Sequence, residues 1–201
     1  MDTGRLIAFE GGDSSGKSTQ ARLLAETVGG VLTREPGGTA VGERIRSVLL
    51  DRAVEELAPR AEALLMAAAR AQHVAEVIKP ALLAGRTVIT DRFSHSSLAY
   101  QGYGRGLDLD ELRRLSDWAT EGLWPDLVIF LDVAPEVAAA RLVGDRDRLE
   151  AEEQGFHDRV VDGFRALAHS DPAHWTVVDG NGSVEEVAVR VLNAYEGRDR
   201  T

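Results

Sequence analysis

The sequence predicts an α/β fold in which helices surround a five-stranded parallel sheet. Short apolar segments alternate with helical patterns along the chain, which is the order that a parallel sheet requires. Five of these segments are rich in β-branched or aromatic residues, as expected for strands that are buried on both faces. The expected strands are 6–10, 31–34, 87–90, 127–131 and 175–178.

Helical patterns fill the gaps between these strands. Pro36, Pro125 and Pro135 fall at element boundaries, where a missing backbone N–H does little harm. The expected helices are 17–28, 41–50, 60–83, 94–101, 110–121, 135–142, 148–168 and 184–194. The length of 201 residues suits one α/β domain with a sizeable core, and no linker divides the chain. We therefore expect a single domain over residues 1–201, with a short lid segment at about 142–154.

The composition argues against nucleic-acid-binding, membrane-spanning and disulfide-bonded classes of protein. A formal net charge of −10 argues against a broad nucleic-acid-binding face. No apolar run is long enough for a membrane span, and the N-terminus lacks a signal-peptide pattern. The chain has no cysteine, which removes disulfides and thiolate metal sites and favours a cytoplasmic location. We expect neither nucleic acid nor a membrane as a partner, and we expect the arginines to converge on a small anionic ligand.

The segment between the first strand and the first helix matches the phosphate-binding pattern G-x-x-x-x-G-K-[ST]. Its glycines let backbone N–H groups face inward, and it ends at a helix N-terminus, which favours anions. Lys17 reaches the outer phosphates, and the Ser18 hydroxyl suits the accompanying Mg²⁺. A glycine-rich turn that matches by chance is the alternative, but the flanking strand and helix argue against it. The expected nucleoside triphosphate contacts are Gly11, Gly12, Asp13, Ser14, Ser15, Gly16, Lys17, Ser18 and Thr19.

Charged residues follow two other strands, at the edge where open α/β sheets bind ligands. Arg34 ends the second strand, and Asp91 and Arg92 follow the third. A carboxylate beside a phosphate loop can orient the water around Mg²⁺, and an arginine can hold a phosphate through two N–H groups. We expect Asp91 and Ser18 to form the metal site, although a purely structural cap is the alternative for Asp91.

Further arginines lie in two helical regions. Arg70 interrupts an apolar run at 64–71, so it faces either solvent or a cleft, and Met66 shares its face. Core packing is the simpler interpretation of Met66. Arg141, Arg146 and Arg148 lie close together in the chain, as in a mobile loop that folds over phosphates. A solvated connection with charge pairs is the alternative for this segment.

Several ordered motifs together resemble bacterial thymidylate kinases, and the resemblance runs nearly from end to end. The motifs are Glu10-Gly11-x-Asp13, residues 33–39 (Thr-Arg-Glu-Pro-Gly-Gly-Thr), Asp91-Arg92-Phe93, residues 96–102, Pro125-Asp126-Leu127 leading to Asp132, and Asp147-Arg148-x-Glu150. The resemblance implies a phosphate-loop nucleoside monophosphate kinase fold, usually as a homodimer. It also implies transfer of the γ-phosphoryl group of ATP, with Mg²⁺, to the 5′-phosphate of dTMP, which gives dTDP and ADP.

The resemblance also implies roles for individual residues. The phosphate loop with Lys17 would hold ATP, and lid arginines would supply the essential positive charge, because the loop itself contains no arginine. Asp13 would lie close to the dTMP sugar and phosphate, and Tyr100 would lie under the sugar. The other implied dTMP contacts are Arg34, Arg46 and Arg92 near the phosphate, and Met66, Arg70, Ser97 and Gln101 around the base.

The expected mechanism needs no general base, because an acceptor phosphate is already an anion near neutral pH. The five histidines fall in no shared motif. Catalysis would then consist of positioning and charge stabilisation. The expected catalytic residues are Asp13, Lys17, Arg92, Arg141, Arg146 and Arg148.

Two positions depart from the family pattern and leave alternatives open. Ser14 stands where the family commonly has glycine, and Met66 stands where it usually has a phenylalanine that stacks on thymine. Methionine offers a soft contact to a ring but lacks the aromatic stacking contribution of about 0.5–1.5 kcal/mol. A kinase for another pyrimidine nucleotide is therefore the first alternative. A phosphate-loop switch that signals through a partner is the second, although it would not need a second arginine-lined site.

Overall fold

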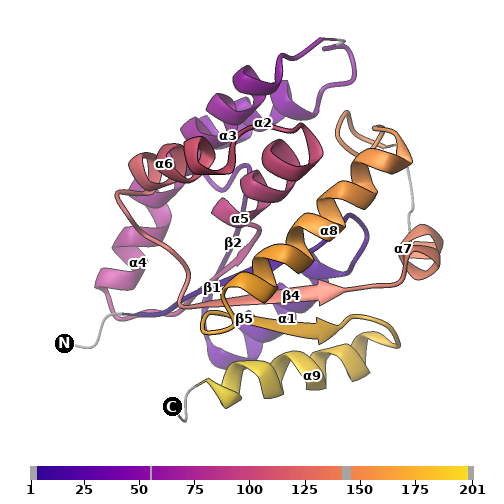
Figure 1. Cartoon of the computed structure of the whole chain (residues 1–201). Coiled ribbons are helices and arrows are strands. Elements are labelled where there is room, and N and C mark those ends of the chain that lie inside the picture. The colour runs from indigo at the N-terminus through magenta and orange to yellow at the C-terminus, as the bar shows by residue number, and fades with distance from the viewer. Residues whose placement is uncertain (1–3, 55, 142–145, 199–201) are drawn as a thin grey trace.

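The computed structural model describes residues 4–54, 56–141 and 146–198. Its centre is a five-stranded parallel sheet with strand order β2-β3-β1-β4-β5 (Figure 1). The strands are β1 (Leu6–Glu10), β2 (Val31–Arg34), β3 (Val88–Asp91), β4 (Leu127–Asp132) and β5 (Trp175–Asp179). The predicted fold class is confirmed, and the strand boundaries differ from the predicted ones by at most one residue.

Helices cover both faces of the sheet (Figure 1). They are α1 (Lys17–Val28), α2 (Ala40–Leu50), α3 (Pro59–His73), η1 (Val74–Ile78), α4 (Lys79–Leu83), α5 (Ser94–Ser97), η2 (Leu98–Gly104), α6 (Leu109–Thr120), α7 (Pro135–Arg141), α8 (Gln154–Ser170) and α9 (Val184–Gly197). None of the described helices is both long enough and apolar enough to span a membrane.

The two-residue period of the strands divides the core between the two faces. In β1, Ile7 and Phe9 pack in one hydrophobic cluster with Leu24 of α1 and Val191 of α9. The alternate residue Leu6 belongs to a cluster on the opposite face, with residues of η1 and α4. A third cluster joins β4 and β5 to η2, α6 and α8. The inner strands β1, β3 and β4 are therefore buried on both faces, as the sequence predicts, whereas the edge strands β2 and β5 are partly exposed, because each has a neighbouring strand on one side alone.

The predicted helix over 60–83 contains a π-helical turn at η1. Pro80 lies two residues after the end of this turn. Proline cannot donate a backbone hydrogen bond, and its ring crowds the carbonyl group four residues earlier. A widened turn before Pro80 accommodates that crowding, and π turns of this kind are commonly single insertions in α-helices.

The prediction that a helix begins at Arg148 is wrong, because α8 begins at Gln154. The backbone N–H of Asp147 donates to Glu150 Oε2 at 3.1 Å, and the N–H of Glu150 donates to Asp147 Oδ1 at 2.9 Å. These side chains therefore stabilise a separate turn in place of the first helical turns. Of the predicted lid at 142–154, residues 142–145 lie outside the described residues, as does the predicted helix end at 142.

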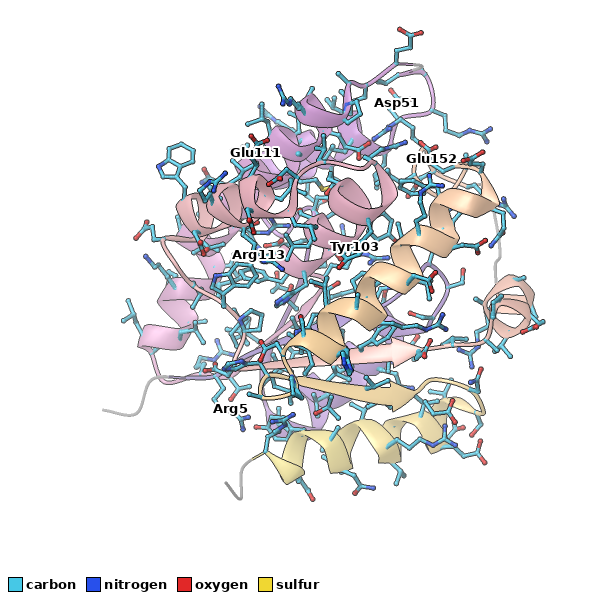
Figure 2. The ribbon with its side chains drawn as sticks, in the orientation of Figure 1. Arg5, Asp51, Tyr103, Glu111, Arg113 and Glu152 are labelled. Carbon is cyan, nitrogen blue, oxygen red and sulfur yellow. The ribbon has the colours of Figure 1, made fainter. Side chains whose placement is uncertain are left out.

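The middle of α8 lies against η2. A Cβ atom at Gly163 of α8 would lie 2.6 Å from the ring of Tyr103, so only glycine allows this approach. Tyr103 lies on the η2 side of α8 (Figure 2). This close packing holds η2, which carries Tyr100 and Gln101, in the hydrophobic cluster that η2 shares with β4 and α8.

Candidate active site

The phosphate loop connects β1 to α1 and curls around the side chain of Lys17. Gly11 and Gly16 have φ angles of 146° and 93°, which favour glycine. A Cβ atom on Gly11 would also lie 2.8 Å from the carbonyl oxygen of Leu131. Lys17 Nζ donates to Gly12 O at 2.6 Å and to Ser15 Oγ at 3.2 Å. The loop thus folds around the ammonium group of Lys17.

Ser14 adopts a left-handed backbone conformation with φ of 57°. This conformation costs roughly 1–2 kcal/mol for a residue with a side chain. The position at which the family commonly has glycine is therefore one where the backbone itself favours glycine. The loop keeps its curled form with Ser14 in place.

Burial lowers the pKa of Lys17 to about 8, with the positive charge of Arg92 adding to the effect. The carboxylates of Asp91, Asp13 and Glu10 act in the opposite direction. A bound triphosphate adds negative charge beside the ammonium group, which raises its pKa. Binding of ATP and protonation of Lys17 are therefore coupled.

We expect ATP affinity to fall as the pH rises above about 8, because the free protein then loses the proton that ATP binding favours. The dissociation constant should increase up to about tenfold per pH unit until the pKa of the complex is reached. Isothermal titration calorimetry between pH 7 and 10 measures this slope. Lys17→Met should bind weakly at pH 7 and lack the slope, and an equal slope in that variant would contradict the assignment.

Arg92 is the centre of a hydrogen-bonded cluster at the end of β3. Its Nη2 donates to Asp13 Oδ1 at 2.7 Å and to the Tyr100 hydroxyl at 2.9 Å. Its Nη1 donates to Gly11 O at 3.0 Å and to Ser96 Oγ at 3.2 Å. Burial opposes the charge of Arg92, but Tyr100 and nearby carboxylates including Asp13 raise its pKa above its usual value. The guanidinium group is therefore a fixed positive charge beside the phosphate loop.

Asp13 shares this cluster and remains ionised. Burial raises the pKa of Asp13, but the charges of Arg92 and Lys17 outweigh that effect and hold the pKa below its usual value. The Tyr100 hydroxyl donates to Asp13 Oδ1 at 2.9 Å, and His157 Nδ1 lies 3.7 Å from Asp13 Oδ2. Asp13 Oδ2 is buried without a hydrogen-bond partner among the described residues. The presence of His157 at the site was not predicted from the sequence.

Glu10 is a buried carboxylate that holds the backbone around Arg92, a role that the sequence did not indicate. Glu10 Oε1 accepts from the backbone N–H groups of Phe93 and Ser96 at 3.0 and 3.1 Å, and Oε2 accepts from Ser96 Oγ at 2.5 Å. Arg92 itself has φ of 72°, in the left-handed region. These bonds stabilise a backbone conformation that is costly for arginine.

A second arginine cluster lies at the other end of the site. Arg70 of α3 donates from Nε to Glu35 Oε2 at 2.7 Å and from Nη2 to Ser97 Oγ at 3.0 Å. Glu35 Oε1 also contacts His73 Nδ1 at 2.9 Å. Arg70, Glu35 and His73 are all buried. Of the two interpretations of Arg70, the structure supports the one in which it faces a cleft, with Glu35 fixing its direction.

One cleft of about 270 Å³ connects the two clusters. Met66 lines it, which excludes a purely core role for that side chain. Arg34 and Arg46 also line it, where Arg34 bonds Glu43 and Arg46 donates to Pro36 O at 2.8 Å. The cleft is lined by all nine predicted substrate residues: Asp13, Arg34, Arg46, Met66, Arg70, Arg92, Ser97, Tyr100 and Gln101.

A second cleft of about 460 Å³ lies on the other side of the phosphate loop. Its walls come from the loop, from β4 and α7, and from the first turns of α8. Asp13, Tyr100 and Glu150 are among its lining residues and also line the first cleft, so the two clefts are contiguous. His157 and Arg146 line the second cleft as well.

The three predicted lid arginines lie in different places. Arg146 lines the second cleft. Arg141 donates to the carbonyl oxygens of Gly180 and Gly182 at 3.0 and 3.1 Å and to Ser15 O at 3.5 Å, and so bridges α7 to the loop before α9 and to the phosphate loop. Arg148 donates to Leu49 O at 2.8 Å and to a buried carboxylate of α3. Arg141 thus contacts the phosphate loop, whereas Arg148 bonds α2 and α3.

Ser18 and Asp91 fit the expected Mg²⁺ site. The Ser18 hydroxyl donates to Asp91 Oδ2, while Asp91 Oδ1 is buried without a partner in the described part of the chain. No group of three or more acidic, histidine or cysteine side chains that could hold a metal occurs among the described residues. Mg²⁺ commonly keeps several waters and uses one or two protein oxygens plus phosphates. This donor set therefore suits a hydrated ion that arrives with a nucleotide.

The sheet, the phosphate loop and the adjoining arginine-lined cleft define a phosphate-loop nucleoside monophosphate kinase. Residues 9–191 match the family model for thymidylate kinase. The chain belongs to the thymidylate kinase family and is therefore an enzyme of the phosphotransferase class.

Individual relatives agree with this assignment. A thymidylate kinase from Leifsonia xyli subsp. xyli is 51% identical over 203 residues, covering 97% of this chain and 96% of the relative. One from Exiguobacterium sp. is 48% identical over 198 residues, covering 95% and 93% respectively. The crystal structure of thymidylate kinase from Ehrlichia chaffeensis superposes with a TM-score of 0.81 at 32% identity, covering 96% of this chain and 99% of that one.

Proposed function

We propose that this enzyme transfers the γ-phosphoryl group of ATP, accompanied by Mg²⁺, to the 5′-phosphate of dTMP. The observation that carries the proposal is the single cleft that joins Lys17 and Arg92 at one end to Arg70 and Ser97 at the other. One end offers fixed positive charge for phosphates, and the other offers fixed hydrogen-bond donors for a base. A switch that only hydrolyses or exchanges nucleotide has no need of the second end.

The chemistry follows from positioning and charge. Backbone N–H groups of the phosphate loop and Lys17 bind the donor phosphates, and Arg92 holds the acceptor phosphate beside them. Bound Mg²⁺ supplies charge neutralisation on the transferred group, and Ser18 and Asp91 are the residues that would hold it. Arg146 is the lid arginine whose position on the second cleft suits it to cover developing charge, while Arg141 and Arg148 orient the surrounding segments.

Asp13 and Tyr100 suit the sugar end of the acceptor. Tyr100 is buried, and Arg92 holds its hydroxyl group. Burial also raises the pKa of Tyr100 well above its usual value, so the hydroxyl stays protonated. A rigid ring at this position leaves little room for a ribose 2′-hydroxyl, which favours a deoxyribonucleotide.

Because of Met66, dUMP is an alternative substrate to dTMP. A methionine contacts either thymine or uracil through a flexible, polarizable side chain. The fixed Arg70–Glu35 pair nevertheless presents the same donors to both bases. We therefore propose dTMP as the preferred acceptor and dUMP as the next best.

The proposal extends to assembly and location. Family members usually form homodimers, and Leu64 of α3 and Trp118 of α6 have relative exposures of 58% and 82% in the single chain. Large exposed apolar side chains of this kind are compatible with a subunit interface. We propose a homodimer in the cytoplasm, where ATP and deoxynucleotides are available.

A panel of acceptors tests the proposal. ADP release is measured with ATP, Mg²⁺ and, in turn, dTMP, dUMP, ribo-TMP, dCMP, dGMP and AMP. We expect dTMP to give the highest kcat/KM, dUMP to be lower, and the remaining nucleotides to be poor acceptors. Equal rates with dUMP would show that Met66 has relaxed base choice. Release that does not depend on any acceptor would favour the switch.

A further inference from the structure

Glu62 of α3 is a fully buried carboxylate beside the base end of the cleft, and none of the roles above includes it. Its relative exposure is 0%. Glu62 Oε1 accepts from Gln101 Nε2 at 2.8 Å, and Oε2 accepts from Arg148 Nη2 at 2.6 Å. Arg105 donates to both oxygens, at 3.3 Å from Nε and 3.1 Å from Nη2. One side chain thus receives hydrogen bonds from three partners.

The surroundings keep Glu62 ionised. Burial raises its pKa, but the hydrogen bonds from Arg105, Gln101 and Arg148 outweigh burial and leave the pKa below its usual value. An ionised carboxylate accepts hydrogen bonds on both oxygens and donates none. Every group that faces Glu62 must therefore present a donor.

This requirement fixes the direction of the Gln101 amide. An amide has a donor end, Nε2, and an acceptor end, Oε1, and only Nε2 can face a carboxylate. Gln101 lines the cleft with Arg70 and Ser97. Its Oε1 is buried and has no hydrogen-bond partner among the described residues. An unpaired buried acceptor is costly, and a ligand that supplies the missing donor gains the difference.

We propose that Glu62 is a positioning residue for base selection, which orients Gln101 so that Oε1 accepts from the N3–H group of a pyrimidine-2,4-dione. This inference rests on the proposed function of the cleft and specifies how the cleft chooses its base. Thymine and uracil carry a donor at N3 between two carbonyl acceptors, whereas neutral cytosine carries an acceptor at N3. Arg70 supplies donors for a carbonyl oxygen, and Gln101 supplies the acceptor for N3–H.

Glu62→Gln tests the proposal with almost no change in shape. An amide can accept on only one oxygen, and the charged donors Arg148 and Arg105 compete for it more strongly than Gln101 does. The new NH₂ group then faces Gln101, whose own amide must turn over and present its NH₂ group to the base. The acceptor for N3–H is lost and a donor takes its place.

The probe pair is dTMP and N3-methyl-dTMP, which has a methyl group in place of the N3 proton and the same two carbonyl groups, sugar and phosphate. In the wild type we expect kcat/KM for dTMP to exceed that for N3-methyl-dTMP by about tenfold or more. In Glu62→Gln the ratio should fall by about tenfold, mainly through loss of dTMP turnover. An unchanged ratio in this variant would overturn the proposal.

Glu152→Gln is the matched control. Glu152 accepts from Arg105 Nη2 at 2.6 Å but makes no hydrogen bond to Gln101 among the described residues, and it lies just before the start of α8 (Figure 2). The same substitution in the same network should keep the wild-type ratio of kcat/KM for dTMP to that for N3-methyl-dTMP. A fall equal to that of Glu62→Gln would show that the ratio reports general loosening, and would overturn the proposal.

The wild type provides a readout that does not depend on the folding of a variant. With glutamine labelled by ¹⁵N, the Gln101 NH₂ protons should show nuclear Overhauser contacts to Glu62 methylene protons with and without dTMP. Contacts from these NH₂ protons to the thymine N3 proton alone would overturn the proposal. A wild type that turns over no dTMP would instead count against the proposed function, so the two failures are distinguishable.

Discussion

Replacing Arg92 with alanine is expected to lower kcat/KM for dTMP by about 10³-fold, within the range that single arginines contribute to phosphoryl transfer. Arg92 bonds Asp13, Tyr100 and the phosphate loop at once, so its loss removes both a fixed charge and the order of its neighbours. The dissociation constant of ATP should change by less than about threefold, because Lys17 and the loop backbone remain. Steady-state kinetics and titration with ATP measure the two effects separately.

Arg22→Ala is the matched control for this prediction. Arg22 lies on α1, pairs with Glu26 at 2.8 Å, and has about half of its side chain exposed. A pair of this kind contributes little to stability. The control should retain wild-type kinetics, and a normal turnover number in Arg92→Ala would remove Arg92 from the acceptor site.

Glu10→Gln is expected to make the protein more stable than the wild type above pH 7 and equally stable below about pH 4.5. Burial raises the pKa of Glu10 to about 7, against the opposing effects of Arg92 and Ser96. Between about pH 4.5 and 7 the folded wild type holds a proton that the unfolded chain releases, so wild-type stability falls as the pH rises. The glutamine keeps an acceptor for the Phe93 and Ser96 amides and has no proton to lose.

Urea unfolding of both proteins between pH 4.5 and 8.5 measures this effect. The difference in free energy of unfolding should grow through the window and level off above pH 7, at up to about 3 kcal/mol. A difference that is constant with pH would contradict the assignment of the proton to Glu10.

The sheet was predictable because its strands are apolar on both faces and alternate with helices. Leu6 and Ile7 serve opposite hydrophobic clusters, so the pattern that the sequence shows is the pattern that the core uses. The phosphate loop was predictable for a similar reason, since its glycines and Lys17 act within nine residues. Local patterns of this kind can be recognised in a sequence without knowledge of the tertiary fold.

The buried carboxylates were not predictable from local patterns. Glu10 bonds residues more than eighty positions away, and Glu62 bonds Arg148 across 86 positions. A glutamate at the end of a strand or near the start of a helix is ordinarily read as a solvated cap. The same limit explains His157, which reaches Asp13 only because α8 packs beside the phosphate loop.

Direct identification of the product tests whether the enzyme transfers the phosphoryl group of ATP to dTMP. ³¹P NMR of the enzyme with ATP, Mg²⁺ and dTMP should show the β-phosphate of dTDP growing in step with ADP, with little inorganic phosphate. Without dTMP, ATP should stay intact over the same period. Equal formation of ADP and inorganic phosphate with dTMP unchanged would contradict the account, because it would show hydrolysis without transfer to an acceptor.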